Sequence, residues 1–313
     1  MSIFEKAFEK AGKGTAEEQA DQLLGSADDL LNIPASLDDD GAGSSLGDDP
    51  DSGLCSEDQS LAAGSGKLVK LDLSRLRDAG LVDPGSSKTN RTTEEFRRIK
   101  RPLLMHVRGQ GATVVNNANM IMVTSALPGE GKTFTSINLA MSIAMEMDKT
   151  VLLIDADVAK PDVTARLGVE AERGLIDILL DDGLTLPEVL LRTDIPKLTL
   201  LPSGRRHVHS TELLASERMR QLTLELSNRY SDRIVIFDSP PLLATNEARV
   251  LANLMGQVVL VTEESRTPQH AVKEAVEMLE DNEIVGIVMN KGARRKGDEG
   301  YGYGGYGYYP YGG

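Results

Sequence analysis

Short apolar runs alternate with amphipathic stretches between residues 67 and 291. The apolar runs are mostly continuous, as is typical of strands buried on both faces of a parallel sheet. The amphipathic stretches carry apolar residues at helical spacing. The alternation predicts an α/β fold with a mostly parallel sheet and helices on both faces. The predicted strands are 120–124, 151–154, 198–201, 234–237, 258–261 and 286–289, and the clearest predicted helices are 133–147, 212–230 and 269–282.

The two ends of the chain differ from this middle domain. Residues 1–66 open with a short amphipathic stretch and continue as a Gly-, Ser-, Ala- and Asp-rich segment that is typical of a flexible acidic linker. The opening stretch is either a docking helix or a weakly helical tail without a partner. Residues 292–313 form a Tyr- and Gly-rich tail in which we expect no regular element. We therefore predict three parts: 1–66, 67–291 and 292–313.

Composition and charge exclude several classes of protein. Of the 313 residues, 40% are hydrophobic, which is enough for a sizeable core. The single cysteine, Cys55, excludes an internal disulfide and a cysteine-based zinc site. No run of about 18 apolar residues occurs, so we expect no membrane-spanning helix. The net charge of −14 argues against nucleic acid as a partner, and residues 1–66 carry −12 of it.

A candidate phosphate loop, SALPGEGKT, lies between the predicted strand 120–124 and the predicted helix 133–147. In this context backbone N–H groups and the positive end of the helix converge on phosphate oxygens. Lys132 is placed to reach the β- and γ-phosphates, and Thr133 offers its hydroxyl to Mg²⁺. The fold is therefore expected to be P-loop NTPase-like, with nucleotide contacts from Gly129, Glu130, Gly131, Lys132, Thr133 and Phe134.

Carboxylates follow two of the predicted strands. Asp155 and Asp157 come after 151–154, and Asp238 comes after 234–237. Ligands of open α/β sheets bind at the carboxyl ends of strands. Asp238 is the natural acid to orient Mg²⁺, whereas Asp155 and Asp157 either hold metal-bound water or accept a proton from an attacking hydroxyl. Helix capping by Asp155 and turn formation by Asp157 are the structural alternatives. The predicted metal ligands are Thr133, Asp155, Asp157 and Asp238, and the predicted catalytic residues are Lys132, Asp155 and Asp157.

These features together resemble one known family. The chain resembles the bacterial tyrosine kinases, which are autokinases of capsule and exopolysaccharide export. The resemblance lies in a phosphate loop, an Asp-x-Asp motif after an apolar strand, a second acidic strand end and a terminal tyrosine cluster. The resemblance runs from about residue 92 to the end. The stretches LLIDADVAKPDV, TELLAS and IFDSPPLLATNEARVLA resemble the exosortase-associated (PEP-CTERM system) branch. Where the family motif commonly has Arg, this chain has Ala159, followed by Lys160.

The resemblance implies a mechanism and an assembly. It implies a protein-tyrosine autokinase that uses ATP and Mg²⁺ and phosphorylates tail tyrosines of a neighbouring subunit. Family members assemble into a ring through a Glu-x-x-Arg-x-x-Arg helix, which Glu95, Arg98 and Arg101 match; the alternative is a solvated charged face. Asn290 and Lys291, just after the last predicted strand, either face the adenine, as similar positions do in related P-loop proteins, or cap their loop. The predicted phosphoacceptors are Tyr301, Tyr303, Tyr306, Tyr308, Tyr309 and Tyr311.

The same resemblance implies partners and a location. Besides further copies of itself, the chain is expected to meet a membrane polysaccharide co-polymerase and a cognate tyrosine phosphatase. We expect a cytoplasmic protein that a partner recruits to the inner face of the plasma membrane.

Two other functions fit parts of the sequence. A partition-type P-loop ATPase uses a second lysine early in the loop, where this chain has Leu127. A non-catalytic, nucleotide-dependent adaptor of the polysaccharide machinery would use the tail as an interaction segment. The retained Lys132 and the three carboxylates favour the kinase over the adaptor.

Overall fold

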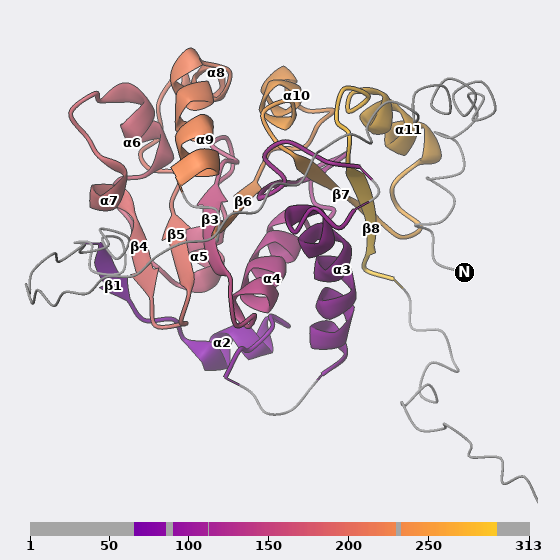
Figure 1. Cartoon of the computed structure of the whole chain (residues 1–313), viewed down its shortest axis with the longest axis horizontal. Coiled ribbons are helices and arrows are strands. Elements are labelled where there is room, and N and C mark those ends of the chain that lie inside the picture. Colours follow the sequence, from indigo (N-terminus) through magenta and orange to yellow (C-terminus); the bar gives the residue numbers. More distant parts are fainter. Residues whose placement is uncertain (1–65, 86–89, 112, 230–232, 293–313) are drawn as a thin grey trace, which may run out of the picture. The chain divides into compact units, whose positions relative to one another are not determined.

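The computed structural model describes residues 66–85, 90–111, 113–229 and 233–292. These residues build a sheet of eight strands in the order β1-β4-β5-β3-β6-β2-β7-β8, with helices on both of its faces (Figure 1). The leader, Cys55 and the tail tyrosines lie outside the described residues. The strands are β1 (Lys67–Val69), β2 (Met120–Ser125), β3 (Thr150–Asp155), β4 (Leu191–Thr193), β5 (Leu198–Leu201), β6 (Arg233–Asp238), β7 (Gln257–Glu263) and β8 (Val285–Asn290).

The sheet is mostly parallel, as predicted. Only β4 and β5 pair antiparallel, and β1 runs parallel to β4, so these two strands at one side run opposite to the others. The six predicted strands are confirmed, each within two residues of its observed bounds. β1 and β4 were not predicted, because each has three residues and carries an exposed cation, Lys67 or Arg192, in place of a continuous apolar run.

Alternate residues of the central strands supply two separate cores, because successive side chains point to opposite faces of a sheet. In β2, Met120 and Met122 belong to one core and Ile121 and Val123 to the other, and all four are fully buried. The core of Ile121 is covered by α2 (Leu73–Asp78), α3 (Arg91–Val107), α4 (Lys132–Ala144) and α5 (Val163–Leu167). The core of Met120 is covered by α6 (Leu175–Leu180), α7 (Leu186–Val189), α8 (Ser210–Leu214), α9 (Glu217–Arg229), α10 (Asn246–Ala252) and α11 (Gln269–Glu277).

One helix prediction is wrong. The single helix expected over 212–230 is two helices, α8 and α9, separated at Ala215 and Ser216. The Ser216 hydroxyl accepts a hydrogen bond from the Met219 amide at 3.2 Å, so it caps the start of α9. The other two predicted helices are confirmed, although α4 ends at Ala144 and α11 at Glu277, both earlier than expected.

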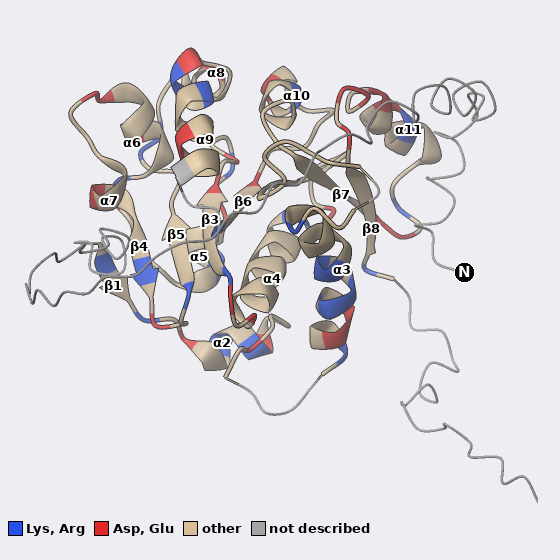
Figure 2. Ribbon diagram, in the orientation of Figure 1, with Lys and Arg blue, Asp and Glu red and all other residues tan. Residues whose placement is uncertain are grey.

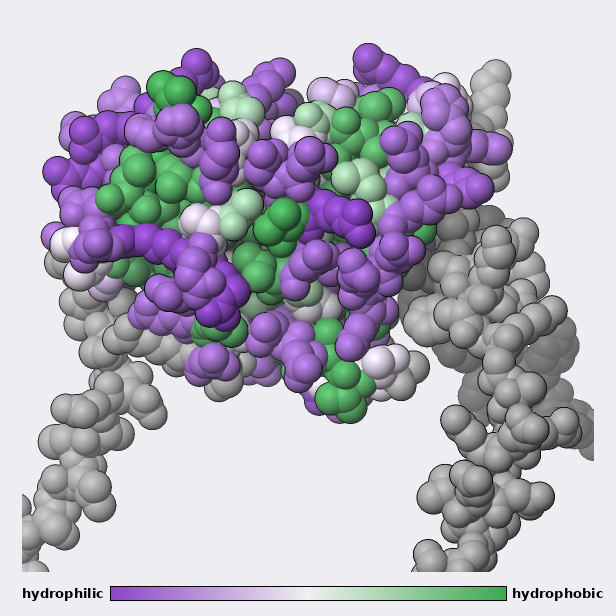
Figure 3. Space-filling view, turned by 90° about the horizontal axis from the view of Figure 1, so that it is seen from above, coloured by the Kyte–Doolittle hydropathy of each residue, from purple (hydrophilic) through white to green (hydrophobic). Residues whose placement is uncertain are grey.

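The described surface is mixed in character. Figure 3 shows apolar patches separated by hydrophilic residues on the face seen from above. The most exposed large apolar side chains belong to different segments of the chain: Val208, Met147 and Val114. Within the described ranges, no helix is both long enough and apolar enough to cross a membrane.

Candidate functional site

A tight loop joins the end of β2 to the start of α4. Gly129 (φ 88°) and Gly131 (φ 101°) adopt left-handed backbone conformations, which a side chain would strain. The loop delivers the chain directly into α4 at Lys132, and the first amides of a helix have no partner within the helix. The loop and helix start therefore present N–H groups and a positive dipole end, as the sequence predicts for a phosphate site.

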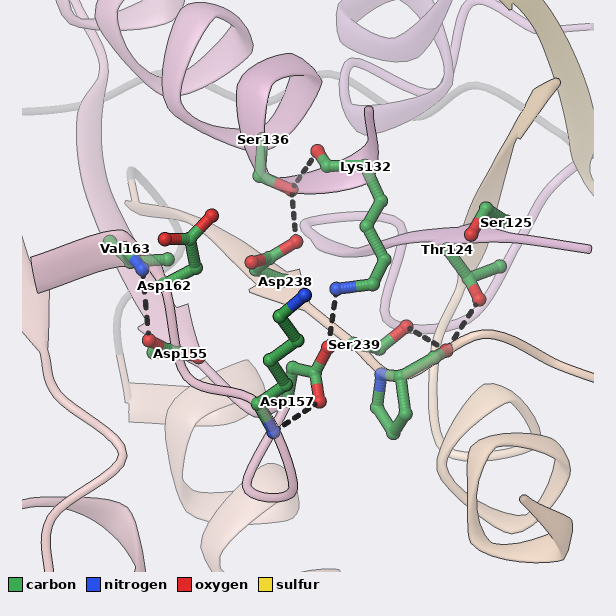
Figure 4. A network of polar contacts seen from close by, with 12 residues as sticks. Thr124, Ser125, Lys132, Ser136, Asp155, Asp157, Asp162, Val163, Asp238 and Ser239 are labelled. Carbon is green, nitrogen blue, oxygen red and sulfur yellow. Dashed lines mark hydrogen bonds and ion pairs between the residues drawn. The ribbon is translucent and has the colours of Figure 1, made fainter. Parts of the chain in front are cut away.

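Two of the predicted carboxylates lie side by side because of the sheet register. Asp155 ends β3 and Asp238 ends β6, and the two residues are register partners on these neighbouring strands (Figure 4). Both are fully buried. The Ser136 hydroxyl, one turn into α4, lies 3.0 Å from Asp238 Oδ1, and Asp155 Oδ2 accepts the Val163 amide at 3.1 Å. The strand ends and the phosphate loop thus converge on one site.

Lys132 connects the loop to these carboxylates. Its ammonium forms an ion pair with the carboxylate of Asp157, two residues beyond β3 (Figure 4). Asp157 Oδ1 also accepts the Lys160 amide at 3.1 Å. Burial favours the neutral amine of Lys132, but the charges of Asp238 and Asp157 outweigh it and raise its pKa. Lys132 is therefore charged and held toward the acidic strand ends.

The buried carboxylates carry more negative charge than Lys132 balances. Burial, followed by repulsion from Asp238, raises the pKa of Asp155 to about 8. Burial also raises the pKa of Asp238 to about 6, although Lys132 and the hydroxyls of Thr133 and Ser136 oppose the shift. Asp155 Oδ1 and Asp238 Oδ2 are buried without a hydrogen-bond partner. A cation would relieve both conditions.

The chemistry of this donor set fits Mg²⁺. Carboxylate and hydroxyl oxygens are its preferred protein ligands, and Thr133 and Asp238 are already neighbours. In the described part of the chain, no three His, Cys, Asp or Glu side chains come close enough together to form a metal cage. Mg²⁺ in nucleotide sites usually has one or two protein carboxylates and takes its other ligands from phosphates and water. The site therefore suits a metal that arrives with a nucleotide.

Residues at or just beyond the ends of β7 and β8 contact the phosphate loop, and one of them, Thr267, was not predicted. The Glu130 side chain is buried, accepts the Leu127 amide at 2.8 Å and hydrogen-bonds the Thr267 hydroxyl. Asn290 donates to the Glu130 carbonyl at 2.9 Å, and Lys291 donates to the Gly129 carbonyl at 2.8 Å. The sequence indicated Asn290 and Lys291 by their place after a strand, but nothing in the pattern indicated Thr267.

Phe134 and the charged stripe of α3 lie beside this site. The ring of Phe134 packs edge-on against Phe96 of α3, 6.3 Å between centroids, which leaves its backbone for any phosphate contact. The side chains of Glu95, Arg98 and Arg101 are exposed on α3, which Figure 2 shows as a strongly charged helix. Glu95 accepts a hydrogen bond from Arg91 at 2.6 Å. The predicted stripe is therefore at the surface.

Comparison with known proteins gives consistent matches. Residues 118–281 match the model of a family described as an AAA domain. The tyrosine-protein kinase YwqD of Bacillus subtilis is 34% identical over 213 residues, 67% of this chain and 85% of YwqD. The tyrosine-protein kinase wzc of Salmonella typhimurium is 33% identical over 188 residues, which are 59% of this chain but 26% of wzc. The solved VpsO kinase domain shares 32% identity with a TM-score of 0.55, covering 64% of this chain and 94% of that domain.

The family model matches residues 118–281, which contain the phosphate loop and the acidic strand ends, and the relatives named tyrosine kinases lead to the same assignment as the motifs. The chain belongs to the bacterial tyrosine-kinase family.

Proposed function

We propose that this chain is an ATP-dependent protein-tyrosine kinase that phosphorylates its own tail tyrosines, 301, 303, 306, 308, 309 and 311. The observation that carries the proposal is the convergence of Lys132, Asp155 and Asp238 at one buried site beside the loop glycines. The names of YwqD and wzc, both tyrosine-protein kinases, support it. A generic nucleotide switch would explain the loop but not the tyrosine cluster.

The residues of the site take distinct roles in this reaction. The loop amides and Lys132 bind the β- and γ-phosphates, and Lys132 exchanges its ion pair with Asp157 for phosphate oxygens. Thr133 and Asp238 would hold Mg²⁺, which supplies charge neutralisation on the phosphates when bound. The tyrosine hydroxyl oxygen bonds to the γ-phosphorus while the bond from that phosphorus to the ADP oxygen breaks. The phenolic proton passes to a carboxylate.

Asp155 is the better proton acceptor of the two candidates. A general base works best when its pKa is near the operating pH. The pKa of Asp155 is raised to about 8 without a bound cation, and Mg²⁺ beside Asp238 would lower it toward that range. Asp157 pairs with Lys132 until nucleotide binds, and it also accepts the Lys160 amide. Asp157 therefore positions Lys132 before nucleotide binds, and Asp155 accepts the proton.

The finer biological setting is also part of the proposal. We place the kinase in exopolysaccharide biosynthesis and export, in the exosortase-associated branch, because of the resemblances in sequence. The succinoglycan biosynthesis transport protein ExoP of Rhizobium meliloti, 30% identical over 218 residues, supports a role of this kind. The chain acts in a ring of copies, with transfer between subunits, beside a membrane co-polymerase at the inner face of the plasma membrane and a cognate phosphatase.

Loss of the loop lysine tests the kinase assignment. Lys132→Met should abolish phosphotyrosine formation with Mg-ATP, because the charge that stabilises the phosphates is removed. The protein is first treated with a tyrosine phosphatase, the phosphatase is removed, and phosphotyrosine is then followed by anti-phosphotyrosine blotting. Lys273→Met on the exposed face of α11 is the matched control and should keep full activity.

The outcome also separates the kinase from the alternatives. Near-normal phosphorylation of Lys132→Met would show that the site assigned here is not the kinase site. If the wild-type chain binds ATP but never gains phosphotyrosine, the non-catalytic adaptor becomes the better reading. If the wild-type chain hydrolyses ATP without phosphorylating itself, the partition-type ATPase becomes the better explanation.

A further inference from the structure

The phosphate loop is held from outside by residues at the end of β8 and just beyond it. Asn290 Nδ2 donates to the Glu130 carbonyl at 2.9 Å. Lys291 Nζ donates to the Gly129 carbonyl at 2.8 Å and pairs with Glu263 at 2.9 Å. Two consecutive carbonyls of the loop are thus fixed by side chains that lie 160 and 162 residues away in the sequence.

A hydrogen bond that fixes the direction of a backbone carbonyl also fixes the direction of the N–H group of the next residue. A peptide unit is planar and trans, so its C=O and N–H groups point in opposite directions, and no peptide bond is cis in the described ranges. The bond from Lys291 therefore sets the direction of the Glu130 N–H, and the bond from Asn290 sets that of the Gly131 N–H. Both carbonyls are turned toward β8, so both amides point away from it.

The Asn290 side chain is itself held in one orientation. Its Oδ1 accepts the Lys291 amide at 2.8 Å, which leaves Nδ2 to face the loop. Lys291 has a left-handed backbone with φ 56°, a conformation that costs a non-glycine residue energy. A Cβ on Gly131 would overlap the Asn290 amide, so the glycine allows this close contact. The two segments are fitted to each other.

We propose that Asn290 and Lys291 are positioning residues that aim the Glu130 and Gly131 amides at the nucleotide phosphates. This rests on the nucleotide-binding part of the proposed function and assigns Asn290 a role different from adenine contact. A residue that reads adenine affects only ligands that carry the base. A residue that aims loop amides affects every ligand that binds through phosphates.

Asn290→Ala in the full chain separates these roles, because it removes no charge. Binding of a fluorescent ADP is measured directly, and inorganic triphosphate is measured by its competition with that probe. We expect both dissociation constants to rise by the same factor, about 3- to 10-fold, the usual effect of losing one hydrogen bond. Asn290→Asp keeps the shape, loses the donor and adds a negative charge beside the loop, so it should weaken both ligands more than Asn290→Ala does.

Asn282 provides the matched control. Its Nδ2 also donates to a backbone carbonyl, that of Ala252 at 2.7 Å, away from the loop. Asn282→Ala should lower the melting temperature and leave both dissociation constants unchanged. A loss of affinity for ADP alone would overturn the proposal in favour of adenine contact. Unchanged binding of both ligands to Asn290→Ala and Asn290→Asp would overturn it outright.

The same samples keep the two proposals distinguishable. If the wild-type chain binds ADP but forms no phosphotyrosine with Mg-ATP, the kinase proposal fails and the positioning role is still decided by the binding data. If the wild-type chain binds neither ADP nor triphosphate, both proposals are wrong.

Discussion

At the scale of single residues, the site is governed by buried charge. Asp155 and Asp238 are fully buried register partners, and Lys132 is the cation that lies among the site's carboxylates. Two of the buried carboxylate oxygens have no hydrogen-bond partner. Such an arrangement lowers stability in the absence of ligand and is retained where it serves binding or chemistry.

This buried charge predicts an unusual pH dependence of stability. An unfolded Asp ionises near pH 4, whereas the pKa of Asp155 in the folded chain is about 8. Between these values the folded protein binds more protons than the unfolded one, so the free energy of unfolding falls as pH rises. Asp155→Asn removes the titration and can still accept the Val163 amide.

The melting temperature of Asp155→Asn should therefore exceed that of the wild type at pH 8 by at least about 2–4 °C, the equivalent of about 1 kcal/mol. The gain should shrink toward pH 5. Calorimetry in EDTA without nucleotide measures it, with Asp148→Asn, at an exposed ion pair with Arg108, as the control. Equal shifts for the two variants at both pH values would contradict this account of Asp155.

The sequence predicts which residues form the site better than it predicts which atoms they contact. Lys132, Asp155 and Asp238 were predicted together because a glycine-rich loop and the ends of parallel strands must meet at one edge. The role of Thr267 was not predicted, because a hydroxyl in a loop gives no pattern until folding brings Glu130 within reach. Asn290 was indicated by its position, but its partner, a main-chain carbonyl, cannot be recognised in a sequence.

At the scale of elements, a strand could be predicted from the sequence when it was long and contained a continuous apolar run. The strands β2, β3, β6 and β7 have six or seven residues each and contain an apolar run of four residues, and they were predicted. The two three-residue strands acquire their structure from pairing with neighbours, as Leu191 of β4 does with Lys67 and Leu200. Such pairings join distant segments and leave no local periodicity.

Helix α3 has one face packed against the domain and another exposed to solvent. The buried Lys100 donates to the Ser142 carbonyl at 2.6 Å and pairs with Glu146 at 2.6 Å, which ties α3 to the end of α4. Phe96 meets Phe134 near the start of α4. An anchored helix with an exposed charged stripe is suited to transmit contacts between subunits to the phosphate loop.

Removal of that stripe tests its role in assembly. Glu95→Ala, Arg98→Ala and Arg101→Ala combined should give smaller particles in light scattering and slower autophosphorylation, because charges that pair across subunits are lost. The control is Lys273→Ala, Glu274→Ala and Glu277→Ala, an exposed charged triplet on α11. If particle size and rate are the same as in the control, the stripe is only a solvated face.

At the scale of the whole molecule, the topology places the root of the tail at the chain's own phosphate loop. β8 ends at Asn290, Lys291 contacts the Gly129 carbonyl, and Gly292 begins the tail. The Tyr- and Gly-rich composition of residues 292–313 predicts a flexible coil, and ten residues of such a coil, the separation between Lys291 and Tyr301, have a typical end-to-end distance of about 17 Å. A tail of that reach would not be kept from the chain's own site by distance, so distance alone does not favour transfer between subunits.

We predict that transfer occurs between subunits, because a ring brings a second site to each tail and the in-line reaction requires the hydroxyl to approach the γ-phosphorus opposite the ADP oxygen. Lys132→Met protein with an intact tail is mixed with protein truncated after Lys296, which has an active site but no tail tyrosine. Mass spectrometry should find phosphotyrosine on the full-length chains, at a rate that rises with total concentration because assembly precedes transfer. Either protein alone should gain none on its tail, which is the internal control. If the two proteins co-sediment as one assembly and the full-length chain still gains no phosphate, transfer between subunits is excluded, and each tail must turn back to the site beside its own root.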